Sequence, residues 1–303
     1  MTASGTHPST LANKSCVFFI GPRKTGTSWI NLYLGQRSDV LTPSTTKETF
    51  FFDRYYDRGT AWYLDQFLPD GRDSDVMVEC APSYSGNATA MERIARKVPH
   101  ARFVITLREP LARVQSHWRH MIRYGADAAS LEVHMQDGAE IWADAQYDSI
   151  LRRALSLLGP ERVSVVLYED LRADPDAFAR SVSAAIGIEY RAPDKSASET
   201  VMNVAQKPRS RALSALASRG SEALRNARLH GVVRAARKAG LRNLLERPYE
   251  KSESAINEET KAAIRDQLSA QMAALSETLN AHPDVVPLGR CDHVLSQIDH
   301  WRG

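Results

Sequence analysis

Four short apolar runs occur at intervals in the first part of the chain, at residues 16–20, 76–79, 102–107 and 163–169. They are rich in Val, Ile and Phe and do not alternate with polar residues, which is typical of strands buried on both faces of a parallel sheet. Between them, apolar residues recur at helical spacing, first at Trp29, Ile30, Tyr33 and Leu34. The alternation predicts an α/β fold in which helices flank a central parallel sheet.

Two further helices have recognisable ends in the sequence. Residues 110–124 begin with a proline and are followed by Gly125, and residues 174–186 are followed by Gly187. Proline at the start and glycine just past the end are the usual signals of helix termini. Both segments are therefore predicted to be helices that alternate with the strands.

The strand signals stop at about residue 200. Apolar residues then recur at helical spacing, which predicts a helix that faces the core. Its members are Ile264, Leu268, Met272, Leu275 and Leu279. We expect residues 1–14 to be a flexible tail and residues 15–303 to form a single domain. That domain would comprise an α/β core (15–200) and a mostly helical C-terminal part (201–303) that is not a separate domain.

Composition and net charge bear on the class of protein and on its possible partners. The chain has 303 residues, of which 43% are hydrophobic and 25% charged, with a net charge of +3. These values are ordinary for a globular domain, and with no nucleic-acid motif they give no reason to expect a nucleic-acid partner. Residues 207–251 hold twelve Lys and Arg against three Asp and Glu. Either a solvated helical face or the border of a cleft for a polyanion accounts for that stretch.

Cysteines and apolar segments bear on the cellular compartment. Cys16, Cys80 and Cys291 are too few and too widely spaced for a disulfide framework or a zinc site. The first residues lack the apolar core of a signal peptide, and no run approaches the ~18 apolar residues of a membrane span. We therefore expect a cytoplasmic protein without a membrane span.

The segment GPRKTGTSW, residues 21–29, follows the first predicted strand and opens the first predicted helix. Such a loop aims backbone N–H groups at one point, where a helix N-terminus favours an anion. It resembles the P-loop G-x-x-x-x-G-K-[ST] at Gly21, Gly26 and Ser28. However, Thr27 stands at the lysine position, and Lys24 comes three residues earlier. An ordinary Gly/Pro turn is the alternative.

The displaced lysine indicates a phosphate ligand without a γ-phosphate, since Lys24 is placed to neutralise a group leaving from a 5′-phosphate. A second phosphate site is indicated by Arg108, which ends the third apolar run, and by Ser116 on the following helix. None of the runs ends in an obvious Walker-B aspartate. The alternative for Arg108 is an ion pair with Glu109 or another acid, and for Ser116 a surface position.

Together, these two segments resemble the nucleotide signature of sulfotransferases that use 3′-phosphoadenosine 5′-phosphosulfate (PAPS). The resemblance implies a P-loop-like fold. It assigns the 5′-phosphosulfate to the loop and the 3′-phosphate to Arg108 and Ser116. A basic loop near NVAQKPRSR would close over the nucleotide through Lys207, Arg209 and Arg211. The loop residues that it implies are Arg23, Lys24, Thr25, Gly26, Thr27 and Ser28.

The segment KETFFFD resembles the E-x-x-F-F-D stretch of the heparan-sulfate and Golgi-type branch, which implies that Glu48 is the catalytic base. The alternative is that Glu48 is a solvated loop acid beside Lys47. VECAPSY is similar to the E-K-T-P-x-Y stretch of that branch, with Glu79, Pro82 and Tyr84 in register. Cys80 replaces the lysine of that stretch, so the contact made by that lysine is not expected here.

The implied reaction moves the sulfonyl group of PAPS to a hydroxyl and yields adenosine 3′,5′-bisphosphate. Glu48 would accept the hydroxyl proton, Lys24 would stabilise the departing phosphate, and no metal would be required. The expected acceptor is a small, glycosylated or hydroxylated secondary metabolite. The alternatives are an atypical P-loop small-molecule kinase and a catalytically inactive nucleotide-binding protein. The sequence leaves the oligomeric state open.

Two further groups of residues near these motifs have structural alternatives to a role in the site. His117 and His120 are predicted to be helix-surface residues rather than a metal pair. The aromatic residues that follow Glu48 suit either the core or a wall of the acceptor pocket. They are Phe50, Phe51, Phe52, Tyr55 and Tyr56.

Overall fold

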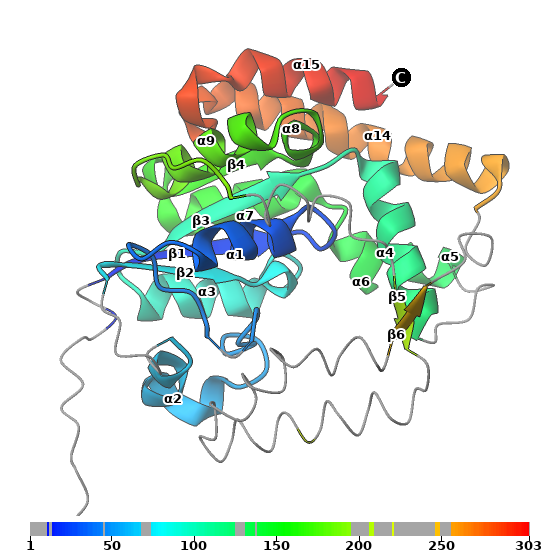
Figure 1. The fold of residues 1–303 in the computed structure, drawn as a ribbon. Coiled ribbons are helices and arrows are strands. Elements are labelled where there is room, and N and C mark those ends of the chain that lie inside the picture. The colour runs from blue at the N-terminus through cyan, green and yellow to red at the C-terminus, as the bar shows by residue number, and fades with distance from the viewer. Residues whose placement is uncertain are drawn as a thin grey trace, which may run out of the picture.

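A computed structural model of the chain shows how these segments are arranged. It describes Leu11, Gly220 and residues 14–44, 46–67, 74–124, 131–136, 138–194, 206–208, 246–248 and 256–302. Figure 1 shows the sheet at the centre and helices packed around it.

The centre of the described fold is a four-stranded parallel sheet in the order β2-β1-β3-β4. Its strands are β1 (Ser15–Gly21), β2 (Val76–Cys80), β3 (Arg102–Leu107) and β4 (Val163–Leu167). Each strand falls on one of the four apolar runs, so the predicted α/β fold is confirmed. The end of the fourth run differs, because its last residues, Tyr168 and Glu169, begin a helix.

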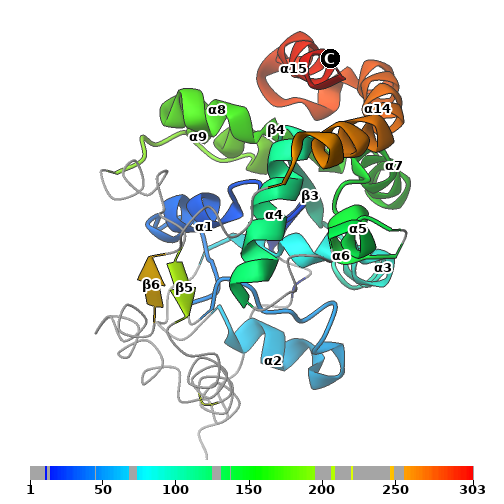
Figure 2. The same cartoon turned by 90° about the vertical axis from the view of Figure 1, so that its right-hand side faces the viewer.

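Helices cover both faces of the sheet, as Figure 2 shows. On one face, Val17 and Phe19 of β1 pack in a cluster with α1 (Thr27–Gly35), α8 (Tyr168–Ala173) and α9 (Pro175–Ile186). The stripe predicted in the first helix is confirmed, because its four apolar side chains are buried.

The opposite face of β1, with Phe18 and Ile20, packs in a second cluster. This cluster takes in α2 (Gly59–Asp65), α3 (Ala88–Lys97), α7 (Tyr147–Leu158), α14 (Glu258–Ala281) and α15 (Cys291–Arg302). Alternate residues of one strand thus face the two helical layers, which is the period of two expected of a strand. The arrangement is the predicted three-layer α/β fold.

Two helices end where the sequence predicted. Helix α4 spans Pro110–Tyr124. Helix α9 is capped by Asp174, whose carboxylate accepts from the N–H groups of Asp176 and Ala177 at 2.9 and 3.2 Å. It ends at Gly187, whose φ of 74° is left-handed. Side-chain caps and glycine ends of this kind satisfy backbone groups that a helix leaves unpaired.

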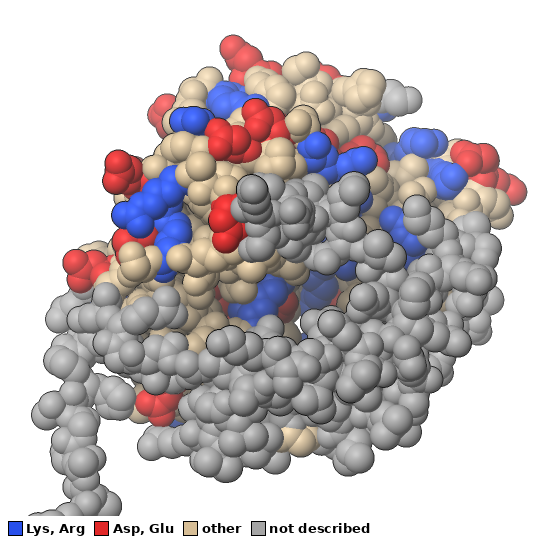
Figure 3. All heavy atoms as spheres, viewed as in Figure 1, with Lys and Arg blue, Asp and Glu red and all other residues tan. Residues whose placement is uncertain are grey.

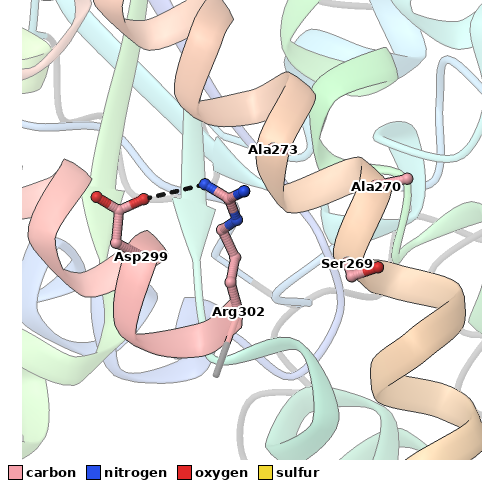
Figure 4. A pocket seen from close by; sticks show the side chains of 5 residues that line it. All are labelled: Ser269, Ala270, Ala273, Asp299 and Arg302. Atoms are coloured by element: carbon pink, nitrogen blue, oxygen red, sulfur yellow. Dashed lines mark hydrogen bonds and ion pairs between the residues drawn. The ribbon is translucent and has the colours of Figure 1, made fainter.

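The C-terminal stripe is confirmed as a core-facing helix. All five predicted side chains of α14 are at most 3% exposed. Two lie against α4 in a third cluster and three join the main core. On the outer side, α14 and α15 leave a surface depression lined by Ser269, Ala270, Ala273, Asp299 and Arg302 (Figure 4).

The C-terminal region, which we expect to be mostly helical, also contains two short strands that the sequence does not signal. β5 (Gln206–Pro208) and β6 (Glu246–Pro248) form an antiparallel pair in which Lys207 faces Arg247 in register. Each has only three residues, too few to show a strand pattern in the sequence. β5 lies beside α4, the helix that carries Ser116.

The remaining described elements are short connections. They are α5 (Leu131–His134), α6 (Glu140–Ala143) and the 3₁₀ segments Tyr56–Arg58, Pro82–Tyr84, Pro160–Arg162, Pro283–Val285 and Pro287–Gly289. The three cysteines are buried and unpaired. Within the described ranges, no helix has the length and apolar character needed to cross a bilayer.

An ion-pair cluster connects the C-terminal part to the α/β core. The carboxylate of Asp170 on α8 accepts from Arg290 Nη1 at 2.8 Å and Nη2 at 3.1 Å, and lies 2.9 Å from His293 Nε2. The Asp170 side chain is 11% exposed. We propose that residues 15–303 fold as one domain, supported by this cluster and by the shared core.

Asp170→Ala is expected to lower the free energy of unfolding by about 2 kcal/mol, because Arg290 loses a charge-assisted partner. Urea unfolding followed by circular dichroism and by tryptophan fluorescence should show one coincident transition, shifted to lower urea. Asp266→Ala, at an exposed position of α14, is the matched control. Two separate transitions, of which the variant moves only one, would contradict the single-domain proposal.

Candidate active site

The loop between β1 and α1 has a backbone that other residues would not adopt easily. Gly21 has φ 103°, and a Cβ there would lie 2.7 Å from the backbone of Pro82. Gly26 has φ 88°, and its Cβ would lie 2.9 Å from the ring of Tyr168. Lys24, at φ 72°, is also left-handed. Both glycines of the sequence motif are therefore required by the conformation of the loop.

The loop leads into a helix N-terminus that carries no side-chain cap. Gly26 is the N-cap residue of α1, and no side chain of the described residues caps it. The first N–H groups of a helix have no partner within the helix and carry partial positive charge. The hydroxyl of Thr25 donates to the Pro22 carbonyl at 2.7 Å, which closes the loop below this point. The geometry is that of an anion site.

A cavity of about 550 Å³ opens at this N-terminus. In the space-filling view of Figure 3, several Lys and Arg side chains are visible near the centre of the face that is shown. The cavity brings most of the predicted site residues together. Its lining includes Arg23, Lys24, Gly26, Thr27, Ser28, Glu48, Arg108 and Ser116.

Arg108 reaches the cavity from the carboxyl end of β3. Its Nη1 donates to the carbonyl of Lys24 at 2.8 Å, and its guanidinium lies 4.5 Å from the ring centre of Tyr168. Glu109 has another role, because its carboxylate accepts from the N–H groups of Leu111 and Ala112 at 2.8 and 2.5 Å and so caps α4. The contacts of Arg108 therefore join it to the glycine-rich loop.

Glu48 lines the same cavity as Ser116. Its Oε1 is 3.0 Å from Lys47 Nζ, and both side chains are about one-fifth exposed, at 20% and 23%. Its backbone carbonyl accepts from the Thr46 hydroxyl at 2.9 Å. A contact with Lys47 thus holds the carboxylate, and the Thr46 hydroxyl holds the backbone of the same residue.

The buried carboxylate of Glu79 binds Thr49, the residue that follows Glu48. Its Oε1 accepts from the Thr49 N–H at 2.8 Å and the Thr49 hydroxyl at 2.6 Å, and its Oε2 accepts from Tyr63 at 3.1 Å. Tyr84 also donates to Oε1, at 3.4 Å. Burial raises the pKa of Glu79 to about 7, although the hydrogen bonds from Thr49 and Tyr63 oppose the shift.

This shift predicts a pH dependence of stability. Between pH 4.5 and 7, Glu79 keeps its proton in the folded state. In the unfolded chain, where its pKa is the usual 4.5, Glu79 has lost its proton over most of this range. The contribution of Glu79 to stability is therefore full below pH 4.5 and lost as the pH rises through 7, by up to about 3 kcal/mol. Glu79→Gln should flatten the dependence of the urea midpoint on pH between pH 4.5 and 8. An unchanged slope would contradict the assignment.

Arg23 lines the cavity but is held by two acids. Its Nη1 lies 3.1 Å from Asp144 Oδ2 and its Nε lies 3.2 Å from Glu140 Oε1. The Asp144 side chain is fully buried, and that of Glu140 is 50% exposed. A hydrogen bond from His117 and the charge of Arg23 hold the pKa of Glu140 down, at about 2. Arg23 is thereby oriented by one acid on α6 and one directly after it.

The prediction of a surface position is wrong for His117. Its side chain is 1% exposed, and Nε2 lies 3.1 Å from Glu140 Oε1. Burial lowers its pKa, and the contact with Glu140 opposes this. Acids on α6 and the loop after it make this burial possible, and the sequence of α4 alone does not show them. His120 lines the cavity. Among the described residues, no group of three His, Cys, Asp or Glu side chains is arranged to hold a metal ion.

Other predicted residues fall in different places. The backbone of Lys207 is in β5, whereas Arg209 and Arg211 lie outside the described residues, as does most of the basic stretch 207–251. Cys80 is fully buried in the cluster with α1 and α9, and burial raises the pKa of its thiol to about 12. It brings no charge to the cavity.

The aromatic segment after Glu48 divides between core and cavity. Phe51 and Phe52 are at most 1% exposed, and Tyr56 packs against the same core cluster. Phe50 lines the cavity instead, with the guanidinium of Arg54 4.4 Å from its ring centre. Sequence reasoning gave several lining residues no role in the site, because no motif assigns them a function. They are Trp29, Lys47, Arg54, Pro82, Glu140, Tyr168 and Leu171.

A glycine-rich loop at the carboxyl edge of a parallel sheet, facing a basic cavity, defines the class of nucleotide-binding α/β proteins. Comparison with known proteins narrows this class. A profile described as Sulfotransferase family matches residues 60–192. The described fold aligns with the crystal structure of a sulfotransferase from Alicyclobacillus acidocaldarius with a TM-score of 0.53. That alignment covers 61% of this chain and 85% of the other, at 24% identity, and shows a common fold.

Two curated relatives share the sequence of this region. Bifunctional heparan sulfate N-deacetylase/N-sulfotransferase 3 of Homo sapiens is 28% identical over 190 residues, which are 56% of this chain and 22% of that protein. Bifunctional heparan sulfate N-deacetylase/N-sulfotransferase 1 of Xenopus laevis is 33% identical over 193 residues, or 57% and 22%. The chain thus covers about a fifth of the length of these relatives. The resemblance to sulfotransferases is confirmed over the α/β part of the chain, by the profile match and by these relatives.

Proposed function

We propose that this protein transfers the sulfonyl group of PAPS to a hydroxyl group of a small acceptor. The observation that carries the proposal is the cavity in which Lys24, Glu48, Arg108 and Ser116 meet at the N-terminus of α1. Its volume of about 550 Å³ lies within the usual range for small-molecule sites.

Different residues of the cavity lining would act on the donor and on the acceptor. The N–H groups at the start of α1 and the Lys24 ammonium would hold the 5′-phosphate side of the donor. The acceptor oxygen would attack sulfur in line, and its proton would pass to the Glu48 carboxylate. The electron pair of the broken sulfur–oxygen bond stays on the phosphate, where Lys24 stabilises the charge.

The second phosphate site would distinguish PAPS from ATP. Arg108 presents a planar guanidinium suited to phosphate oxygens, and Ser116 contributes a hydroxyl from α4. The contact of Arg108 with the Lys24 carbonyl joins the two phosphate sites. The contact between β5 and α4 supports the proposal that Lys207 belongs to a basic segment that closes over the nucleotide, and Arg209 remains part of the same proposal.

A small hydroxylated or glycosylated metabolite is the acceptor class that we propose. The curated relatives are named for N-sulfotransfer on heparan sulfate, but each extends far beyond the part that this chain covers. An amine acceptor is therefore the second possibility to test. Three free, buried thiols support a reducing compartment such as the cytoplasm.

An isotope assay tests the reaction class. The protein is incubated with a fractionated cell extract and either sulfur-labelled PAPS without added metal or γ-phosphate-labelled ATP with Mg²⁺. We expect transfer from PAPS only, and mass spectrometry would show whether the sulfonyl group is on oxygen or nitrogen. Transfer from ATP would favour the atypical kinase. No transfer, with tight nucleotide binding, would favour the inactive binding protein.

A further inference from the structure

Lys47 lies between the glycine-rich loop and Glu48, and no motif assigns it a role. Its Nζ is 3.0 Å from Thr27 Oγ1 and 3.0 Å from Glu48 Oε1. All three residues line the cavity. The ammonium of Lys47 therefore joins the loop, where the donor would bind, to the carboxylate that would act as the base.

The position of this ammonium is electrostatically unusual. Thr27 is the first residue of α1, and the N-terminus of a helix disfavours a cation. Lys24 and Arg108 line the same cavity and add positive charge, whereas Glu48 supplies one negative charge next to Lys47. An anion bound at the N-terminus of α1 would be attracted by the helix N-terminus and by Lys24, Arg108 and Lys47, and it would bring Lys47 a further partner.

Thr27 also marks the place that lysine occupies in an ATP-binding P-loop. In this chain, Lys47 brings an ammonium to the side chain of that same position from a separate segment. The lysine that an ATP-binding P-loop has at this position is thus replaced by the ammonium of a residue 20 positions further along the chain. Read from the sequence alone, Lys47 was only a neighbour of Glu48.

We propose that Lys47 is a second catalytic cation, which contacts the sulfonyl group in transfer and the phosphate oxygen that it leaves. This inference rests on the proposed function. The acceptor oxygen forms a bond to sulfur as the bond from sulfur to the 5′-phosphate oxygen breaks. The proton goes to Glu48, the electron pair goes to the phosphate, and Lys47 keeps its protons throughout. Lys24 and Lys47 together face the charge that develops on the leaving group.

The competing view is that Lys47 only neutralises and positions Glu48. A double-mutant cycle with Glu48→Gln separates these two roles of Lys47. The Glu48→Gln variant is the background because it should bind PAPS without turning it over. We expect Lys47→Met in this background to weaken PAPS binding at least about tenfold, the cost of a lost charge-assisted hydrogen bond. Unchanged affinity in calorimetry would overturn the proposal, since Lys47 would then act only through Glu48.

A chemical rescue tests whether the ammonium itself is needed. We expect Lys47→Cys to lower kcat about 10²-fold. Treatment with 2-bromoethylamine restores an ammonium at nearly the original length, whereas iodoacetamide adds a neutral group. We expect only the first reagent to restore kcat. Wild-type kcat in untreated Lys47→Cys, or equal rescue by both reagents, would overturn the proposal.

The cysteines of the chain make this experiment selective. All three are buried, and burial raises the pKa of Cys16 and Cys80 to about 12 and also raises that of Cys291. Thiols that stay protonated react slowly with alkylating reagents. Lys97→Cys, at an exposed position on α3, is the matched control and should show no change in kcat with either reagent.

Failure of the inference can be told apart from failure of the proposed function. If the wild-type protein neither turns over PAPS nor prefers adenosine 3′,5′-bisphosphate to AMP, the proposed function is wrong. If the wild-type protein turns over PAPS and Lys47→Cys does so equally well, only the role of Lys47 is wrong. Lys47→Arg, which keeps a cation, provides a second variant should Lys47→Cys fold poorly, and it should retain more kcat than Lys47→Met.

Discussion

Glu48→Gln is expected to lower kcat by about 10²–10⁴-fold, the usual contribution of a general base. Glutamine keeps the shape of the side chain and an oxygen that accepts from Lys47, but it cannot take up the proton of the acceptor. The segment around it should stay in place, because Glu79 binds the backbone and hydroxyl of Thr49 rather than Glu48 itself. The affinity for adenosine 3′,5′-bisphosphate should therefore remain nearly unchanged.

The measurement is kcat at saturating PAPS together with a calorimetric titration of the nucleotide. Asp57→Asn is the matched control, since Asp57 is an exposed acid shortly after Glu48 in the sequence. It should keep both kcat and affinity. Wild-type turnover by Glu48→Gln would remove Glu48 from the role of base.

Arg108→Ala is expected to weaken the binding of adenosine 3′,5′-bisphosphate about 10²-fold, since a charge-assisted contact to phosphate is lost. AMP, which has no 3′-phosphate, should bind the variant and the wild-type protein alike. Arg108→Lys should fall between the two, because it keeps the charge but lacks the planar fork.

AMP also serves as a control for the loop. Arg108 donates to the carbonyl of Lys24. If that contact shapes the loop, Arg108→Ala will also weaken the binding of AMP at the 5′-phosphate site. Equal losses for AMP and the bisphosphate would show that Arg108 acts through the loop and not on a 3′-phosphate. Arg180→Ala is the matched control for the loss of an arginine, because Arg180 is 54% exposed on α9.

The sheet was predictable because each of its strands is buried on both faces and has an uninterrupted apolar run. The glycine-rich loop was predictable because Gly21 and Gly26 adopt left-handed conformations that leave no room for a side chain. Helix α14 was predictable because one stripe of its side chains meets the core. In each of these cases, the local sequence contains the physical requirement.

Parts of the cavity have no such local requirement. Arg23 is oriented by Asp144 and Glu140, which lie more than 110 residues away and belong to no motif. His117 was misplaced because the acid that pairs with it comes from α6. Lys47 gains its importance from a contact with Thr27 that only the fold creates. Long-range ion pairs of this kind depend on tertiary structure, and one sequence does not show them.

The proposed function requires that two phosphate sites, one at the N-terminus of α1 and one at Arg108 and Ser116, bind one nucleotide at both ends of its ribose. Calorimetric titration of the wild-type protein with adenosine 3′,5′-bisphosphate and with AMP, without added metal, tests this claim directly. We expect the bisphosphate to bind at least about tenfold more tightly than AMP, because it makes an additional charge-assisted contact. Equal affinities would contradict it.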